Sequence, residues 1–245
     1  MDDITLLNNI KAVSKRIAHA AESAGRSPKD VKLVAVTKGV DIKMIKGAIE
    51  TGLREFGESR IQEAREKILN LQSENYPPMP PLAKGEMNGG VKWHLIGHPQ
   101  SNKAKMAVQL FDLIHSVDSV EIAEEINRQA DKTGKIQRIL VQVKLSSEES
   151  KHGISKEKIM ILLEKLGSLR SLKVEGLMTI PPFFNEPEKV RPYFRELKKI
   201  REEAEKGGVK LPELSMGMTN DFEVAIQEGA TIVRVGTAIF GERGR

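Results

Sequence analysis

The chain has 245 residues, of which 39% are hydrophobic and 30% are charged, a composition typical of a folded globular domain with a substantial core. It contains no cysteine, which excludes disulfides, thiolate metal ligands and cysteine nucleophiles. The formal net charge is +5, but the 39 basic residues are interleaved with 34 acidic ones. Since no basic run or basic–aromatic stretch occurs, we expect a solvated mixed surface and no nucleic-acid partner.

The N-terminal residues Met1–Asp3 lack the basic segment and the apolar core of a signal peptide. No apolar run approaches the roughly 20 residues that a membrane span requires. We therefore expect a cytoplasmic protein with no membrane partner.

The chain begins with an amphipathic pattern over residues 3–25, which predicts a helix that ends at Gly25. A regular alternation of short apolar runs with helical segments follows it. The eight predicted strands are Lys32–Lys38, Glu55–Ser59, Lys92–His98, Leu113–Val117, Arg138–Leu145, Val174–Ile180, Glu213–Met218 and Ile232–Phe240.

Several of these runs are almost continuously apolar, as in Leu33–Val36 and Ile139–Val143, which is typical of buried parallel strands. Helix signals separate them: Asp41 can cap a helix that runs through Glu50, and Asn220 with Glu223 forms a capping-box pattern. The alternation predicts one α/β domain over residues 1–245, a (β/α)₈ TIM-type barrel with an extra N-terminal helix. An open doubly wound sheet is the alternative, although no Gly-x-Gly-x-x-Gly follows the first strand.

Residues 74–90 interrupt this alternation. The segment is rich in proline and glycine and has no periodicity. Four prolines between Pro77 and Pro81 exclude a helix or a central strand. We interpret it as an inserted surface loop.

In a barrel of this kind the chemistry lies at the carboxyl ends of the strands. Lys38 directly follows the first strand, where burial would lower the pKa of its ammonium and free the amine to attack an aldehyde. A lysine that merely extends its charge into solvent at a strand end explains the pattern equally well.

Two other strand ends indicate phosphate binding. Ser215 and Gly217 precede a predicted helix, and Gly236 and Thr237 follow Arg234 on the last strand. Free N–H groups at a helix start attract anions, and the last two loops of these barrels commonly hold phosphate. Tight turns are the alternative explanation for the two glycines.

His94 and His98 lie four positions apart on the third predicted strand, an even spacing, so they should share a face. Because the spacing indicates no further ligands, we expect a structural or pocket-lining histidine and no metal site.

The same residues belong to motifs that resemble the pyridoxal phosphate homeostasis proteins, the YggS/PROSC-type family with a barrel like the alanine racemase N-terminal domain. The motifs follow the family order over nearly the whole chain. They are AVTK (35–38), EFGESRIQE (55–63), WHLIGHPQSNK (93–103), HSVDS (115–119), ESKHG (149–153), GLMTIPP (176–182), LSMGMTNDFEVAI (214–226) and VRVGTAIFGER (233–243).

The resemblance implies a fold-type III barrel that binds pyridoxal 5′-phosphate, with Lys38 as the Schiff-base residue and Arg234 facing the pyridine nitrogen. It implies phosphate contacts from Ser215, Met216, Gly236 and Thr237. The full implied cofactor site comprises Lys38, Ser59, His94, Met178, Ser215, Met216, Gly217, Arg234, Gly236 and Thr237.

Three features depart from the family pattern: Ser59 replaces the usual asparagine, Pro99 replaces the usual leucine, and residues 74–90 are an unusual insertion. The serine puts a hydrogen bond beside the cofactor ring in doubt. The proline is expected to stiffen its loop.

An arginine at the pyridine nitrogen weakens the ring as an electron sink, and racemisation needs an acid/base group on each face of the substrate. The related racemases take their second base, a tyrosine, from a further domain, and we expect that domain to be absent here. Only Tyr76 and Tyr193 occur, and neither is an obvious counterpart.

The sequence therefore favours a monomeric carrier or buffer of pyridoxal phosphate over an efficient racemase, with vitamin B6-dependent apo-enzymes as possible recipients. A weak racemase that uses water or His94 as its second group is the alternative. A nucleic-acid or protein-binding module rests only on the mild positive charge.

Overall fold

The computed structural model describes residues 1–73, 90–146 and 152–242. The predicted insertion at 74–90 therefore falls outside the described residues, apart from its last position. In these ranges no helix combines the length and the hydrophobicity needed to cross a lipid bilayer.

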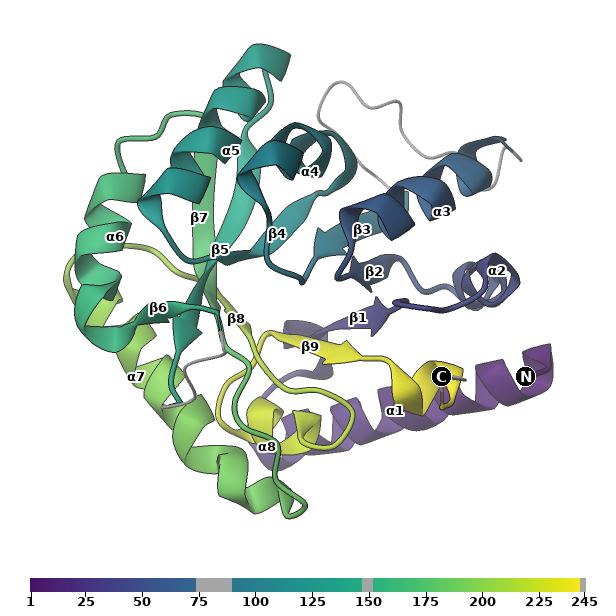
Figure 1. Ribbon diagram of the computed structural model, residues 1–245. Helices are drawn as coiled ribbons and strands as arrows, with labels where there is room; N and C mark the ends of the chain where they lie inside the picture. The colour runs from purple at the N-terminus through teal and green to yellow at the C-terminus, as the bar shows by residue number, and fades with distance from the viewer. Residues whose placement is uncertain (74–89, 147–151, 243–245) are drawn as a thin grey trace.

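Eight parallel strands close into a barrel (Figure 1). Neighbouring strands pair in the order β4-β3-β2-β1-β9-β8-β7-β5, and β4 pairs with β5 to complete the ring. The strands are β1 (Lys32–Val36), β2 (Glu55–Glu58), β3 (Lys92–Leu95), β4 (Leu113–Val117), β5 (Gln137–Lys144), β7 (Leu172–Met178), β8 (Glu213–Ser215) and β9 (Ile232–Val235). The short β6 (Ile154–Ser155) pairs only with β5, outside the ring. The predicted TIM-type barrel is confirmed, and the open sheet is excluded.

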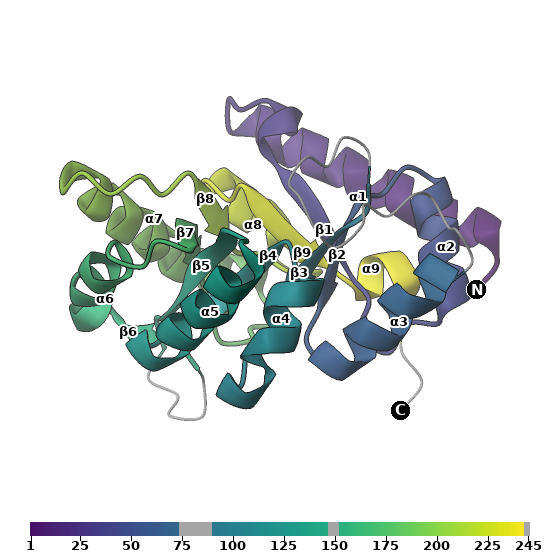
Figure 2. The ribbon, with the colours of Figure 1, turned by 90° about the horizontal axis from the view of Figure 1, so that it is seen from above.

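Helices surround the strands, as the two views in Figures 1 and 2 show. They are α1 (Asp3–Ser23), α2 (Ile42–Glu50), α3 (Ile61–Ser73), α4 (Ala104–Leu110), α5 (Val120–Thr133), α6 (Ile159–Leu166), α7 (Arg191–Lys206), α8 (Phe222–Gln227) and α9 (Thr237–Phe240). The predicted extra helix is α1, which buries Leu6, Ile10, Val13 and Ile17 and packs against α2, α8 and α9.

Three predicted strands are too long by three or more residues at their carboxyl ends. β3 stops at Leu95, β8 stops at Ser215, and β9 stops at Val235, after which Gly236 begins the turn into α9. The main-chain N–H groups of Ile239 and Phe240 both donate to the Gly236 carbonyl, so this apolar segment is helical. The apolar run alone could not distinguish a strand from a short buried helix.

The start of α8 also differs from prediction. Its first residue is Phe222 and Asp221 occupies the N-cap position without a side-chain cap, whereas Asn220 was expected to cap. The Asp221 carboxylate instead accepts a hydrogen bond from the Met218 N–H at 2.6 Å. This bond closes the loop between β8 and α8.

Candidate functional site

The barrel interior has an apolar middle. Val34, Leu113, Leu140, Met178 and Ile232 come from five different strands and form one buried cluster, separate from the larger core between the strands and the helices. Because side chains alternate along a strand, this cluster identifies the inward-facing positions. Met178, which the family resemblance assigns to the cofactor site, therefore lies inside the barrel.

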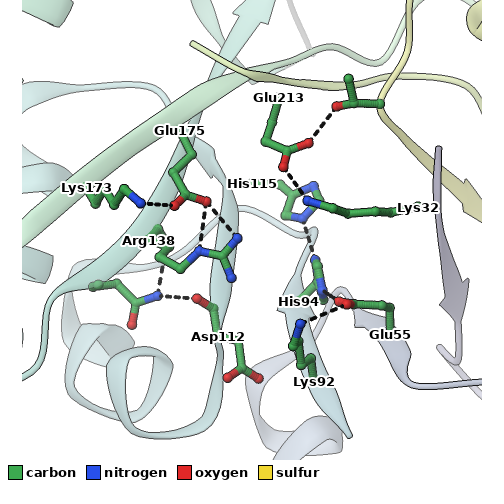
Figure 3. Close-up of polar contacts among 12 residues, drawn as sticks. Lys32, Glu55, Lys92, His94, Asp112, His115, Arg138, Lys173, Glu175 and Glu213 are labelled. Atoms are coloured by element: carbon green, nitrogen blue, oxygen red, sulfur yellow. Dashed lines mark hydrogen bonds and ion pairs between the residues drawn. The ribbon is translucent and has the colours of Figure 1, made fainter. Parts of the chain in front are cut away.

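Ion pairs fill the amino-terminal end of the interior (Figure 3). Arg138 pairs with Glu175 at 2.7 Å, Lys92 pairs with Glu55 at 3.3 Å, and Lys32 pairs with Glu213. These groups satisfy one another's charge. This end of the barrel therefore presents balanced charges.

A chain of hydrogen bonds runs from this end through the barrel. Glu55 Oε2 lies 2.5 Å from His94 Nε2, His94 Nδ1 lies 2.8 Å from His115 Nε2, and His115 Nδ1 lies 2.9 Å from Ser215 Oγ. Arg234 Nη1 then donates to the same Ser215 hydroxyl at 2.6 Å. The chain connects Glu55, at the start of β2, with the carboxyl end of β8.

His115 limits the direction of these bonds. It is fully buried, and burial, followed by the positive charges of His94 and Arg234, lowers its pKa well below the usual value, so its ring is neutral near pH 7. A neutral ring donates through one nitrogen and accepts through the other. Two arrangements of the hydrogens satisfy every bond. They differ in whether His94 carries one proton or two, and His115 adopts the opposite tautomer in each. With His94 neutral the Ser215 hydroxyl donates to His115, and with His94 protonated it accepts.

The Glu55 carboxylate anchors this chain. Burial opposes its charge, but the hydrogen bond and the charge of His94, with help from Lys92, lower the Glu55 pKa to about 2. A carboxyl pKa reduced from 4.5 to about 2 corresponds to about 3 kcal/mol of folding stability. A lowered pKa means that this stability is present above pH 4.5 and is lost as the pH falls toward 2.

We therefore expect Glu55→Gln to destabilise the protein by about 3 kcal/mol at pH 7. The gap should close as the pH falls from 4.5 to 2, because the unfolded parent chain binds a proton at Glu55 in this range while the folded protein binds it only near pH 2. Urea unfolding of both proteins at several pH values measures the gap. A difference that stays constant over this range would show that the charge of Glu55 contributes no stability.

Arg234 is the unusual charge of the carboxyl end. Its side chain is buried on β9, where Nη1 donates to Ser215 and Nη2 donates to the Thr179 carbonyl at 3.0 Å. Burial lowers its pKa to about 10, opposed by the charge of Asp221 at longer range. Among the described residues, no carboxylate forms a direct ion pair with this guanidinium. A buried cation that has no direct anionic partner favours an electron-rich or anionic ligand.

Lys38 follows β1 at the same end and is exposed, so the predicted burial of its amine is wrong. Its neighbour Thr37 turns outward, where its hydroxyl donates to the Glu58 carboxylate at 2.6 Å. Since Val34 faces the interior, alternation along the chain directs Lys38 toward the barrel mouth.

Ser59 follows β2 beside the same mouth. Its hydroxyl is buried and, among the described residues, has no hydrogen-bond partner. Gly97 lets the next strand end approach it, because a Cβ there would lie 2.1 Å from the Ser59 carbonyl oxygen. An unsatisfied buried hydroxyl is costly, and a polar ligand in the mouth would satisfy it.

The expected phosphate-binding residues lie on the loops after β8 and β9. The Met216 side chain packs in the outer core, so only its main chain is available to a ligand. Gly217 has a φ of +91°, and a Cβ there would lie 2.6 Å from the Ala225 side chain, so this glycine permits close packing on α8. Gly236 and Thr237 begin α9, whose first N–H groups have no partner within the helix.

His98 does not share a face with His94, because β3 ends before it. Its ring stacks on His152, with centroids 4.1 Å apart and planes 9° apart, and Asp118 lies beside the pair. The potential ligand atoms of these three residues lie within 4.8 Å of one another. Two nearly parallel rings cannot both hold one ion in their planes, so this arrangement suits ring stacking rather than a shared metal.

Two groups of this region were missed by sequence reasoning: His115 and Glu55. His115 stands two residues after the inward-facing Leu113, and that alternation could have placed it inside the barrel. The contacts of Glu55 with His94 and Lys92 depend on tertiary packing and have no local signal.

The mouth thus combines a lysine amine, an unsatisfied hydroxyl, a buried cation and helix-start N–H groups. A family model described as the alanine racemase N-terminal domain matches residues 8–244. The "Pyridoxal phosphate homeostasis protein" of Aquifex aeolicus is 42% identical over 96% of both chains, and that of Escherichia coli K12 is 36% identical over 99% of this chain and 98% of its own length.

Solved structures agree with this assignment. The structure of PipY of Synechococcus elongatus with PLP bound is 35% identical, covers 92% of this chain and all of its own, and has a TM-score of 0.77. An alanine racemase of Clostridium difficile, 18% identical with a TM-score of 0.70, shares the fold over 97% of this chain and 58% of its own length. The chain belongs to the pyridoxal phosphate homeostasis protein family, within the wider group that shares the alanine racemase N-terminal domain.

Proposed function

We propose that the protein binds pyridoxal 5′-phosphate through a Schiff base to Lys38 and holds it as a cytoplasmic cofactor carrier in vitamin B6 homeostasis. The observation that carries this proposal is that two groups occur at the same end of the barrel. One is the Lys38 amine, and the other is the buried Arg234 cation, which has no direct carboxylate partner among the described residues. The cofactor offers an aldehyde to the amine and an electron-rich ring nitrogen to the guanidinium. PipY, 35% identical, is described with PLP bound.

The remaining predicted residues have consistent places in this proposal. The loops that carry Ser215, Met216, Gly217, Gly236 and Thr237 would hold the phosphate, and Met178 would contribute apolar surface beneath the ring. Ser59 would donate its free hydroxyl beside the ring. His94 would act indirectly, through His115 and Ser215.

A carrier is favoured over a racemase because no second acid/base group is identified among the residues that the structure describes. His94, the candidate for that role, is buried and uses both ring nitrogens for Glu55 and His115. Tyr193 packs near the Phe184 ring, with centroids 6.0 Å apart. We further propose that the protein acts as a monomer and delivers the cofactor to apo-enzymes.

Borohydride trapping tests the binding proposal. The protein incubated with pyridoxal phosphate should absorb at about 420 nm, lose this band on reduction, and carry the label on the peptide that contains Lys38. A protein that stays colourless and unlabelled would defeat the proposal.

Deuterium exchange at the Cα of a panel of amino acids tests the carrier role. Little exchange is expected. Rapid exchange that depends on Lys38 would instead establish an enzyme. Transfer of the bound cofactor to an apo-enzyme, measured by recovered activity, tests delivery.

A further inference from the structure

Lys38 stands between two residues that are held by a single buried group of charges. Lys67 Nζ on α3 donates to the Thr37 carbonyl, to Glu58 Oε1 and to Glu63 Oε1, each at 2.6 Å. The Glu63 carboxylate also accepts the Gly39 N–H. We call Lys67, Glu58 and Glu63 the Lys67 clamp.

The clamp follows directly from the order of the elements. Glu58 ends β2, α3 begins three residues later, and Glu63 and Lys67 lie four positions apart on that helix. This spacing places their side chains on one face of the helix, against the outer side of the barrel wall. The Thr37 hydroxyl donates to Glu58 Oε1 at 2.6 Å, so the loop before Lys38 is attached at both its main chain and its side chain.

The clamp is buried at Glu58 and Lys67 and partly exposed at Glu63, whose side chain is 22% exposed. The Glu58 side chain is fully enclosed and that of Lys67 is 10% exposed. Burial raises the pKa of Glu58, and its Oε2 has no partner among the described residues. Burial also opposes the charge of Glu63, but its bonds to Lys67 and the Gly39 N–H lower the Glu63 pKa.

Such a network is a weak source of net stability, since the desolvation of its charges offsets their attraction. Its main effect is on geometry. With the Thr37 carbonyl and the Gly39 N–H both fixed, the main chain of Lys38 has little freedom. Gly39, with a φ of +67°, permits the turn that returns the chain to the clamp.

We propose that the Lys67 clamp positions Lys38 for its reaction with the cofactor aldehyde, an inference that rests on the proposed function. In this reaction the neutral Nζ attacks the aldehyde carbon, a C=N bond forms, and the carbonyl oxygen leaves as water with the two amine hydrogens. Lys67 and Glu63 bond to Thr37 and Gly39, the neighbours of Lys38, so they are positioning residues. A misplacement of the reacting group by about 1 Å can reduce the rate of such a reaction about 100-fold.

The test compares two ligands on the full chain. Lys67→Met and Glu63→Gln should reduce affinity for pyridoxal phosphate by about 10- to 100-fold, read from the Schiff-base band. Affinity for pyridoxine 5′-phosphate, which has the phosphate and ring but no aldehyde, should be unchanged by calorimetry. Lys67→Arg should restore part of the affinity because it retains donors to the same oxygens.

Lys135→Met is the matched control. Lys135 also donates to two main-chain carbonyls, those of Val108 and Phe111, at 2.6 and 2.7 Å, but it contacts no residue next to Lys38. It should leave both affinities unchanged.

The outcomes separate the two proposals. If the parent protein forms no Schiff base, the proposed function fails. If the parent forms one and both clamp variants match it, or lose affinity for both ligands equally, the positioning role fails. Glu63→Gln, which keeps the Lys67–Glu58 pair, decides the matter if Lys67→Met does not fold.

Discussion

Lys38→Ala is expected to remove the absorbance band at about 420 nm completely. The variant has no amine at the mouth to form the Schiff base, although Arg234 and the loops after β8 and β9 remain. We therefore expect it to bind pyridoxal phosphate about 100-fold more weakly, a loss of about 2.7 kcal/mol, and to give the spectrum of the free aldehyde. Equilibrium titration followed by absorbance measures both effects.

Lys43→Ala is the control for this substitution. Lys43 is an exposed lysine five residues further along the chain, at the start of α2, and its removal should change neither the band nor the affinity. Unfolding in urea should be nearly the same for the two variants and the parent, since Lys38 is exposed and makes little packing contact. A Lys38→Ala protein that keeps the band would place the Schiff base on another lysine.

The barrel could be predicted from sequence because its signals are local. The apolar runs around Val34 and Ile139 are long enough to identify buried strands, and Asp41 caps α2 as expected, with its side chain accepting the Lys43 N–H at 2.8 Å. Errors arose where an apolar segment has no distinguishing period. Ile239 and Phe240 continue the apolar run of β9, yet they belong to the short α9.

The site was predictable only in part. Lys38 and Arg234 follow from strand ends and family motifs, but neither signal showed that Lys38 is exposed and Arg234 is buried. The bond between His115 and Ser215 joins residues 100 positions apart, and the contact of Lys67 with Thr37 joins residues 30 positions apart. Such contacts depend on how the ring closes, so no local pattern indicates them.

One arginine at each end of the barrel allows a direct comparison, because the two differ in whether a carboxylate pairs with them. Arg138 at the amino-terminal end pairs with Glu175, whereas Arg234 at the carboxyl end has no direct carboxylate partner among the described residues. Removal of a paired buried charge leaves its partner uncompensated and costs stability. Removal of an unpaired buried charge removes the free-energy cost of its desolvation.

We therefore expect Arg234→Met to unfold in urea at nearly the parent concentration when the cofactor is absent, because the lost hydrogen bonds to Ser215 and Thr179 are offset by the relieved burial of a charge. Its affinity for pyridoxal phosphate should fall by about 10- to 100-fold, since a hydrogen bond from a charged donor contributes about 1.5–3 kcal/mol.

Arg138→Met should behave in the opposite way. It should lower the free energy of unfolding by about 1–3 kcal/mol, because Glu175 loses one cationic partner but keeps its ion pair with Lys173. Cofactor affinity should be unchanged. Urea unfolding without the cofactor and titration with it separate the two effects for each variant. If Arg234→Met lost stability and kept its affinity, the buried guanidinium would be a structural charge, and the case for a ligand facing it would fail.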